Sequence, residues 1–178
     1  TATLLFTNRP MVIPPKPWTS PFDGGYLINL KRPIQLVRVK SKDCRDIYSE
    51  VDMPNVYKAV NAIQSTAWRI NQRVLEVANA LCSWSHIPES LDMPTAEPAE
   101  PPIRPSEADD NEEAHKEWKR QMVHYYQEDN ARKSKRILVN GLLAIANDYK
   151  EDPEIYFPHN LDFRGRVYPL TRLSPQCN

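Results

Sequence analysis

The sequence has 178 residues, of which 40% are apolar and 26% are charged, and its formal net charge at pH 7 is zero. This composition fits one soluble domain, or two small ones, with a modest core. It excludes a membrane-spanning protein, because no stretch approaches the roughly 20 consecutive apolar residues that a span needs. Three distant cysteines and four histidines form no zinc-binding spacing, which excludes a structural zinc site.

The neutral total hides three blocks of charge. Residues 1–86 hold 11 Lys and Arg against 6 Asp and Glu, a net of +5. Residues 87–114 hold 1 against 9, a net of −8, and residues 115–178 hold 11 against 8, a net of +3. Two basic blocks therefore flank an acidic one, and it is these local charges that bear on polyanion binding.

The first part of the chain is rich in helix breakers. Residues 9–33 contain six prolines and the pair Gly24–Gly25, so an irregular, ordered loop is expected there. Two short β-prone runs at 26–30 and 34–39 flank Lys31–Pro33 and predict a small β-hairpin near residues 26–40.

Apolar residues then recur at alternating steps of four and three. This period predicts one amphipathic helix of roughly 30 residues over about 53–85, with Asp52 as its N-cap and Pro54 in its first turn. The periodic positions are Val56, Val60, Ile63, Ala67, Ile70, Val74, Val77 and Leu81.

A proline-rich, acidic stretch separates this helix from the next. Residues 87–110 contain few apolar side chains, so we expect a mobile, extended linker. A second long helix is expected over about 111–149, starting near Asp110–Asn111, with Glu112 and Glu113 in its first turn. Its apolar side is expected to contain Ala114, Trp118, Met122, Tyr125 and Tyr126.

Four basic residues lie close together in the second predicted helix. Like charges three and four positions apart destabilise a helix, so such a cluster indicates an anionic partner. A solvated helix face is the alternative that the residues leave open. The cluster consists of Arg132, Lys133, Lys135 and Arg136.

The most informative stretch is Phe157–Pro169. We expect short β segments over 155–170 around a tight turn at Gly165, so the fold class is mainly α with a little β. Two flanking guanidiniums, Arg164 and Arg166, are forked donors that suit phosphate oxygens. Asp162 would orient them with a lowered pKa, and Tyr168 could stack on a base or bond a phosphate.

The usual catalytic motifs are missing from the sequence. It has no Gly-x-x-x-x-Gly-Lys phosphate loop, no Gly-x-Gly-x-x-Gly, no Gly-x-Ser-x-Gly and no His-Glu-x-x-His. We therefore expect no catalytic residue and no metal ligand in this sequence. Binding to a polyanion is the chemistry that the residues favour.

Several motifs together resemble one family. Leu161–Tyr168 resembles the Asp-x-x-Gly-Arg motif of single-subunit, bacteriophage-type RNA polymerases, a family that includes mitochondrial and chloroplast enzymes. Ser174–Asn178 is more similar to the phage branch, although Cys177 stands where a glycine is usual. Other matching segments, in order, are Met11–Trp18 with Gly24–Tyr26, Tyr57–Ala59, Thr66–Asn71 and Ala131–Arg136.

The resemblance implies an internal fragment of a DNA-directed RNA polymerase, a nucleotidyltransferase. Residues 1–52 would end its N-terminal domain, 53–150 would form the thumb with a mobile linker at 87–110, and 151–178 would begin the palm. The palm aspartates that bind magnesium would lie beyond residue 178, so this piece alone would be inactive. The start at Thr1, without a methionine, fits this expectation.

The resemblance also implies partners and a nucleic-acid site. The partners would be the DNA template, the RNA–DNA hybrid and, for the whole enzyme, nucleoside triphosphates. A monomer with no membrane contact, in the cytoplasm of an infected bacterial host, is expected. The nucleic-acid-binding residues would be Arg132, Lys133, Lys135, Arg136, Asp162, Arg164, Gly165, Arg166 and Tyr168.

Two other interpretations remain open at this point. The basic clusters could serve protein contacts in a helical scaffold module, in which case nucleic-acid binding would show no steep dependence on salt. A primase or DNA polymerase relative would carry different motifs after Asn178.

Overall fold

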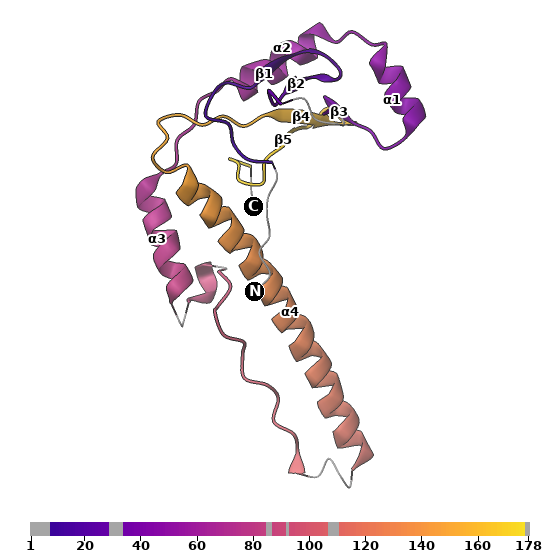
Figure 1. Cartoon of the computed structure of the whole chain (residues 1–178). Coiled ribbons are helices and arrows are strands. Elements are labelled where there is room, and N and C mark those ends of the chain that lie inside the picture. Colours follow the sequence, from indigo (N-terminus) through magenta and orange to yellow (C-terminus); the bar gives the residue numbers. More distant parts are fainter. Residues whose placement is uncertain (1–7, 29–33, 85–86, 92, 107–110, 177–178) are drawn as a thin grey trace. The chain divides into compact units, whose positions relative to one another are not determined.

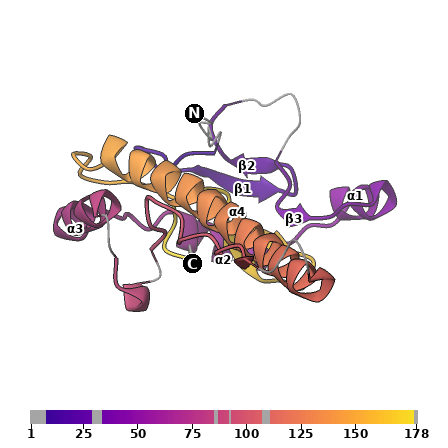
Figure 2. The same ribbon diagram turned by 90° about the horizontal axis from the view of Figure 1, so that it is seen from below.

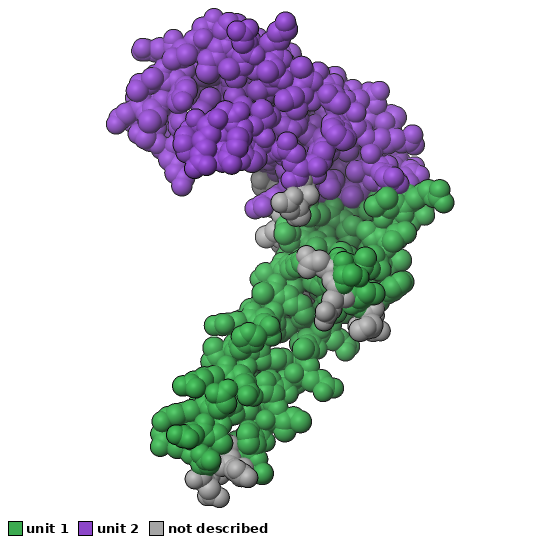
Figure 3. All heavy atoms as spheres, turned by 180° about the vertical axis from the view of Figure 1, so that it is seen from behind, with its two compact units in different colours: residues 1–5, 73–144 green, residues 6–72, 145–178 purple. Residues whose placement is uncertain are grey.

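The computed structural model describes residues 8–28, 34–84, 87–91, 93–106 and 111–176. They form a mainly α fold with two small sheets, as the sequence predicted (Figure 1). The chain divides into two compact units (Figure 3). Among the described residues, 73–144 make up what we call the helical unit, and 8–72 with 145–176 make up the sheet unit.

The sheet unit holds every strand of the described residues. β1 (Lys16–Ser20) pairs antiparallel with β2 (Asp23–Gly25), and the two lie side by side in Figures 1 and 2. In a second sheet, β4 (His159–Asp162) is central. It pairs in parallel with β3 (Val37–Arg38) and antiparallel with β5 (Val167–Pro169). The parallel pairing brings Arg38, distant in sequence, beside Asp162.

Trp18 on β1 is the centre of the core of the sheet unit. Its side chain is only 1% exposed, and its indole Nε1 donates a hydrogen bond of 3.0 Å to the carbonyl of His159. The Asn61 side chain bonds both the N–H and the C=O of Trp18. A Cβ on Gly24 would lie 2.3 Å from the Trp18 ring, so only glycine lets β2 approach this closely. The other buried members of the cluster are Leu36, Val37, Tyr57, Val60 and Leu161.

The predicted continuous helix over 53–85 is wrong, because two helices occupy the region. α2 (Pro54–Gln64) and α3 (Gln72–Ser83) are separated by a non-helical connection. Within it, Trp68 and Ile155 exchange backbone hydrogen bonds of 2.9 and 2.8 Å in an isolated antiparallel bridge. A tertiary contact has thus overridden the local helical pattern.

The break also shifts the buried face by one position. Val74 and Val77, two members of the predicted stripe, are 62% and 59% exposed, whereas Leu75 is buried. At the start of α2, Met53 occupies the N-cap position without a side-chain hydrogen bond, so Asp52 is not the cap. Pro54 does occupy the first turn, as expected.

The predicted hairpin near 26–40 is also wrong. The hairpin lies earlier, at β1 and β2, inside the stretch 9–33 that was expected to be irregular. Val37–Arg38 pairs with β4 instead of with 26–28, and residues 29–33 lie outside the described part. Burial of Trp18 explains the earlier strand, since a buried side chain between exposed ones fits a half-buried strand. Helix α1 (Lys42–Ser49) follows β3 and was not predicted.

The helical unit contains most of α3 and of α4 (Glu112–Asp148), and α4 confirms the predicted second helix. The Asn111 side-chain oxygen accepts hydrogen bonds from the N–H groups of Glu113 and Ala114, at 3.0 and 3.2 Å, and so caps the helix. Gly141 lies inside the helix without ending it. No helix in the described part of the chain combines the length and the apolarity that crossing a membrane requires.

The proline-rich segment between these helices has a short 3₁₀ turn, η1 (Glu89–Leu91), and then forms neither helix nor strand over 93–105. It is nevertheless attached to α4. Arg132 donates hydrogen bonds to the carbonyls of Thr95 and Ala96, and the Trp118 indole donates one to the carbonyl of Pro102. Its expected mobility stays a prediction.

His159 gives the sheet unit a predicted dependence on pH. The ring is buried, and its Nδ1 donates a 2.6 Å hydrogen bond to the carbonyl of Phe157. Burial lowers the pKa of His159, and this outweighs the hydrogen bond to Phe157, which raises it. Because the unfolded pKa is about 6.5, protonation favours the unfolded state, and stability is lost as pH falls below that value.

We therefore expect the urea midpoint of the wild-type chain to fall between pH 7.5 and pH 5.5, and to fall less in His159→Gln. His124→Gln is the matched control, because the His124 side chain is 71% exposed on α4. That variant should keep the wild-type difference between the two midpoints. An unchanged difference in His159→Gln would contradict the assignment to His159.

Candidate nucleic-acid interface

The hairpin between β4 and β5 confirms the tight turn predicted at Gly165. Four residues, 163–166, connect the strands, and the N–H of Gly165 donates a 3.0 Å hydrogen bond to the carbonyl of Asp162. Gly165 has a φ of +81°, in the region that favours glycine. A Cβ at this position would meet nothing within 4 Å, so glycine is needed for the backbone angle and not for space.

The carboxylate of Asp162 holds this turn together. Its Oδ1 accepts hydrogen bonds from the N–H groups of Arg164 and Arg166, both at 2.9 Å. Its Oδ2 accepts one from the Nε of Arg166 at 2.8 Å. Partial burial raises the pKa of Asp162, but the hydrogen bonds from Arg166 and Arg164 outweigh it and lower the net pKa. Asp162 is therefore an orienting carboxylate with its acceptor sites in use, not a proton donor.

Arg166 is oriented by this carboxylate but still accessible. Its side chain is 59% exposed, and the hydrogen bond to Asp162 uses only Nε. The two terminal nitrogens have no hydrogen-bond partner among the described residues. A guanidinium tethered in this way can present its outer edge to a phosphate with little further loss of conformational freedom.

Arg164 and Phe163 form the tip of the turn. Both are exposed, Phe163 to 67%, and the Arg164 guanidinium carbon lies 5.2 Å from the centre of the Phe163 ring. An exposed aromatic ring beside a guanidinium is a surface on which a nucleic-acid base can stack.

Arg38 on β3 adds a third guanidinium, which sequence reasoning missed. Its guanidinium carbon lies 5.4 Å from the centre of the Tyr168 ring, and that of Arg166 lies 5.8 Å from the same ring. The Nε of Arg38 donates a 2.8 Å hydrogen bond to the Asn160 side chain, which fixes its direction. Alternation of Val37, Arg38, Val39 and Lys40 in the sequence is the signal that a strand was displaying cations on one face.

We call Arg38, Arg164 and Arg166 the arginine surface. The structure brings these residues together with Asp162, Gly165 and Tyr168, five of the six being predicted site residues. Tyr168 itself is half-buried between two guanidiniums, so the exposed ring of the surface is Phe163.

The other four predicted site residues lie on α4, in the helical unit. Arg132 is 16% exposed in its side chain and donates to Asp129 and to two backbone carbonyls. Arg136 donates long hydrogen bonds, of 3.4 and 3.5 Å, to the carbonyls of Pro94 and Cys82. Lys133 is 60% exposed and paired with Asp129 at 2.6 Å, and Lys135 is half-buried.

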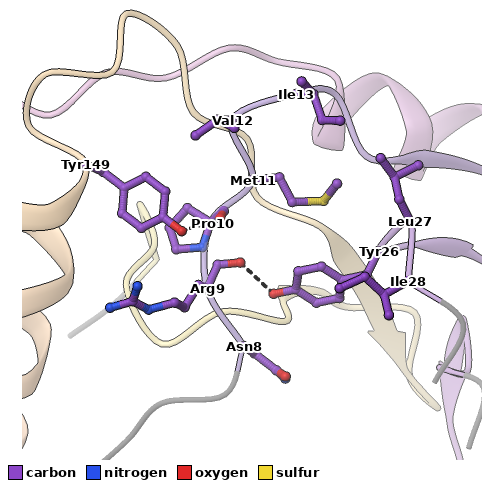
Figure 4. A pocket seen from close by; sticks show the side chains of 10 residues that line it. All are labelled: Asn8, Arg9, Pro10, Met11, Val12, Ile13, Tyr26, Leu27, Ile28 and Tyr149. Carbon is purple, nitrogen blue, oxygen red and sulfur yellow. Dashed lines mark hydrogen bonds between the residues drawn. The ribbon is translucent and has the colours of Figure 1, made fainter. Parts of the chain in front are cut away.

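The sheet unit also has an apolar pocket of about 400 Å³ (Figure 4). Its polar atoms are used within the chain, since the Tyr26 hydroxyl donates to the carbonyl of Arg9 and the Tyr149 hydroxyl to that of Pro10, both at 2.8 Å. Such a pocket suits an apolar group and offers no acid–base pair for chemistry. Its apolar walls include Met11, Val12, Ile13, Leu27 and Ile28.

Comparison with known proteins confirms the resemblance found in the sequence. The family model described as DNA-directed RNA polymerase N-terminal matches residues 1–65. T7 RNA polymerase of Escherichia phage T7 is 46% identical over 170 residues, which cover 96% of this chain and 19% of that protein. The DNA-directed RNA polymerase of Enterobacteria phage K11 is 43% identical over 171 residues, again 96% of this chain and 19% of the relative. The mitochondrial DNA-directed RNA polymerase of Neurospora crassa is 32% identical over 172 residues, 93% of this chain and 12% of the relative.

The chain therefore belongs with the single-subunit, phage-type RNA polymerases, and the phage enzymes are more similar to it than the mitochondrial one. It spans about a fifth of the length of the phage relatives that it matches.

Proposed function

We propose that the chain is part of a DNA-directed RNA polymerase, and that the arginine surface holds the sugar–phosphate backbone of the template strand or of the RNA–DNA hybrid. The observation that carries this proposal is the tether between Asp162 and Arg166, which leaves the terminal nitrogens of an exposed guanidinium available. The relatives named above are RNA polymerases, so a polyanion is the partner that their chemistry supplies.

In the proposed complex, Arg166 and Arg164 donate to phosphate oxygens, which fixes position without reading sequence. Arg38 adds positive charge at the base of the hairpin, and Phe163 stacks on an unpaired base. Affinity of this kind comes largely from the release of counterions, so it falls steeply as salt rises. The basic face of α4, above all the exposed Lys133, contributes further phosphate contacts in the thumb.

Magnesium does not fit the residues present. Among the described residues, no three His, Cys, Asp or Glu side chains are close enough to hold a metal ion. Both oxygens of Asp162 already accept hydrogen bonds from arginine groups. We propose that aspartates elsewhere in the polymerase hold the magnesium ions for nucleotidyl transfer.

The substrates, the oligomeric state and the cellular setting of the whole polymerase are also proposals. The whole polymerase would use nucleoside triphosphates and act as a monomer in the cytoplasm of an infected bacterial host. The phage relatives support this setting, because they are more similar to this chain than the mitochondrial enzyme is.

The salt dependence of binding tests the proposal. We expect the full chain to bind a fluorescent RNA–DNA hybrid with a log–log slope of about −2 to −3.5, as contact with three or four phosphates gives. Arg166→Ala should make the slope less negative by about 1. The measurement is fluorescence anisotropy at salt concentrations from about 50 to about 300 mM, because the affinity of phosphate contacts falls steeply over this range.

Lys58→Ala is the matched control, because Lys58 is an exposed cation on α2 of the same unit. It should leave the slope unchanged. A flat wild-type slope, or the same loss in both variants, would favour the alternative of a helical scaffold module whose basic clusters serve protein contacts.

A further inference from the structure

We infer that residues 94–104, here called the strap, lie antiparallel along one face of α4 and stabilise that helix. Arg132 is the main anchor of the strap, and Arg136 is a second one. Figure 1 shows this segment running beside α4 within the helical unit. The contacts of the strap form within the protein and need no nucleic acid, and they involve two arginines that the sequence pattern assigned to phosphate binding.

Contacts at both ends fix the direction of the strap. Near its start, the Nη1 of Arg132 donates to the carbonyls of Thr95 and Ala96, at 2.8 and 2.9 Å. Near its end, the Trp118 indole donates to the carbonyl of Pro102 at 3.3 Å, and the Arg104 guanidinium carbon lies 5.6 Å from the centre of the Trp118 ring. Later strap residues therefore meet earlier helix residues.

The spacing between these contacts suits an extended, proline-rich chain. The fourteen residue steps from Trp118 to Arg132 rise about 21 Å at 1.5 Å each in an α-helix. The six residue steps from Ala96 to Pro102 span about 19 Å at 3.1 Å each in a polyproline II conformation. The two lengths agree, so the strap follows the helix for four turns without slack. Its prolines at 98, 101 and 102 fix φ and reduce the entropy lost on docking.

Burial along α4 marks the covered face. Over residues 116–132, every half-buried position falls at alternating steps of four and three, and the positions between them are exposed. One stripe of the helix is therefore shielded, as expected for a partner lying along it. Tyr126, expected on this side from the sequence, is 57% exposed and lies outside the stripe. The half-buried positions are Trp118, Met122, Tyr125, Asp129 and Arg132.

Arg132 is built as an anchor. Its Nε and Nη2 donate to Asp129 at 3.0 and 2.7 Å, while Nη1 donates to the two strap carbonyls. A lysine could not make this set of contacts, because it lacks the planar fork. The donors of Arg132 are thus largely committed to protein acceptors, which leaves Lys133, on the exposed side, as the cation of the cluster that faces a partner.

Photo-crosslinking tests the register of the strap. Ala99 is exposed in the middle of the strap, and p-benzoylphenylalanine would replace it in the full chain. We expect crosslinks, mapped by mass spectrometry, within 121–129 of α4 and centred on Tyr125. The same probe at Gln127, which is exposed and lies on the side of the helix opposite the half-buried stripe, should give no crosslink to the strap. Crosslinks from Ala99 that miss α4, or that fall mainly after Arg132, would overturn the inference.

Variants of two neighbouring cations test the anchor. Arg132→Lys keeps the charge and should lower the crosslink yield from position 99 at least about threefold, since the forked contacts are lost. Lys133→Ala should leave that yield unchanged. Far-UV circular dichroism checks that α4 remains helical in both. A wild-type yield in Arg132→Lys with intact helix, or an equal loss in Lys133→Ala, would refute Arg132 as the specific anchor.

Discussion

Replacing Asp162 by asparagine is expected to weaken hybrid binding about fivefold to tenfold, although the change removes a negative charge from a surface that meets a polyanion. Simple Coulomb attraction predicts the opposite sign. A loss is expected because asparagine keeps an acceptor for the N–H groups of the turn but cannot hold the Nε of Arg166 with a charged oxygen. The expected loss is about 1.0–1.4 kcal/mol, within the range of one ordinary hydrogen bond, since the turn itself is kept.

The measurement is the dissociation constant of a fluorescent RNA–DNA hybrid at fixed low salt. Asp43→Asn is the matched control, since Asp43 lies in the first turn of the exposed helix α1 in the same unit. Removing that carboxylate should leave binding unchanged or tighten it slightly. Tighter binding by Asp162→Asn would mean that the carboxylate merely repels the nucleic acid.

Replacing Trp18 by alanine should give the largest loss of stability, about 3–5 kcal/mol in the free energy of unfolding of the sheet unit. The Trp18 side chain is 1% exposed and packs within the core cluster. Its removal also leaves the carbonyl of His159 without the hydrogen bond from the indole. Domains are stable by only about 5–15 kcal/mol, so this single change removes a large share of the total.

Urea unfolding followed by circular dichroism measures this loss. Trp84→Ala serves as the control, because that indole is 49% exposed near the end of α3. It should cost less than about 1 kcal/mol. Equal losses in the two variants would show that Trp18 is not the centre of the core.

The sequence predicted those elements whose signals are local. Helix α4 was predicted within one or two residues because Asn111, the first-turn acids and a long run without proline all agree. The turn at Gly165 was predicted for the same kind of reason, since glycine between two strands indicates a positive φ.

Elements that depend on distant partners were missed. The helix over 53–85 breaks because Trp68 pairs with Ile155, and nothing near Trp68 in the sequence indicates that partner. Likewise, β3 is a strand because it pairs with β4, which is distant in sequence. The predicted hairpin at 26–40 paired the residues of β3 with the preceding segment of the chain instead. Local periodicity carries no information on such pairings.

The candidate site divides in the same way. The arginines of the turn were found from the motif itself, and the tether from Asp162 to Arg166 agrees with the predicted orienting carboxylate. Arg38 was missed because only the sheet brings it to the hairpin. On α4, a list of cations could not distinguish Arg132, whose donors meet the strap, from the exposed Lys133.

A double-mutant cycle on Asp162 and Arg166 tests the central claim most directly. Hybrid dissociation constants are measured for the wild type, Asp162→Asn, Arg166→Ala and the double variant. If the carboxylate acts by orienting Arg166, Asp162→Asn weakens binding about fivefold to tenfold when Arg166 is present, and leaves it unchanged or tighter when Arg166 is alanine. The same fold-loss in both backgrounds would contradict the claim that the two residues work as one binding unit.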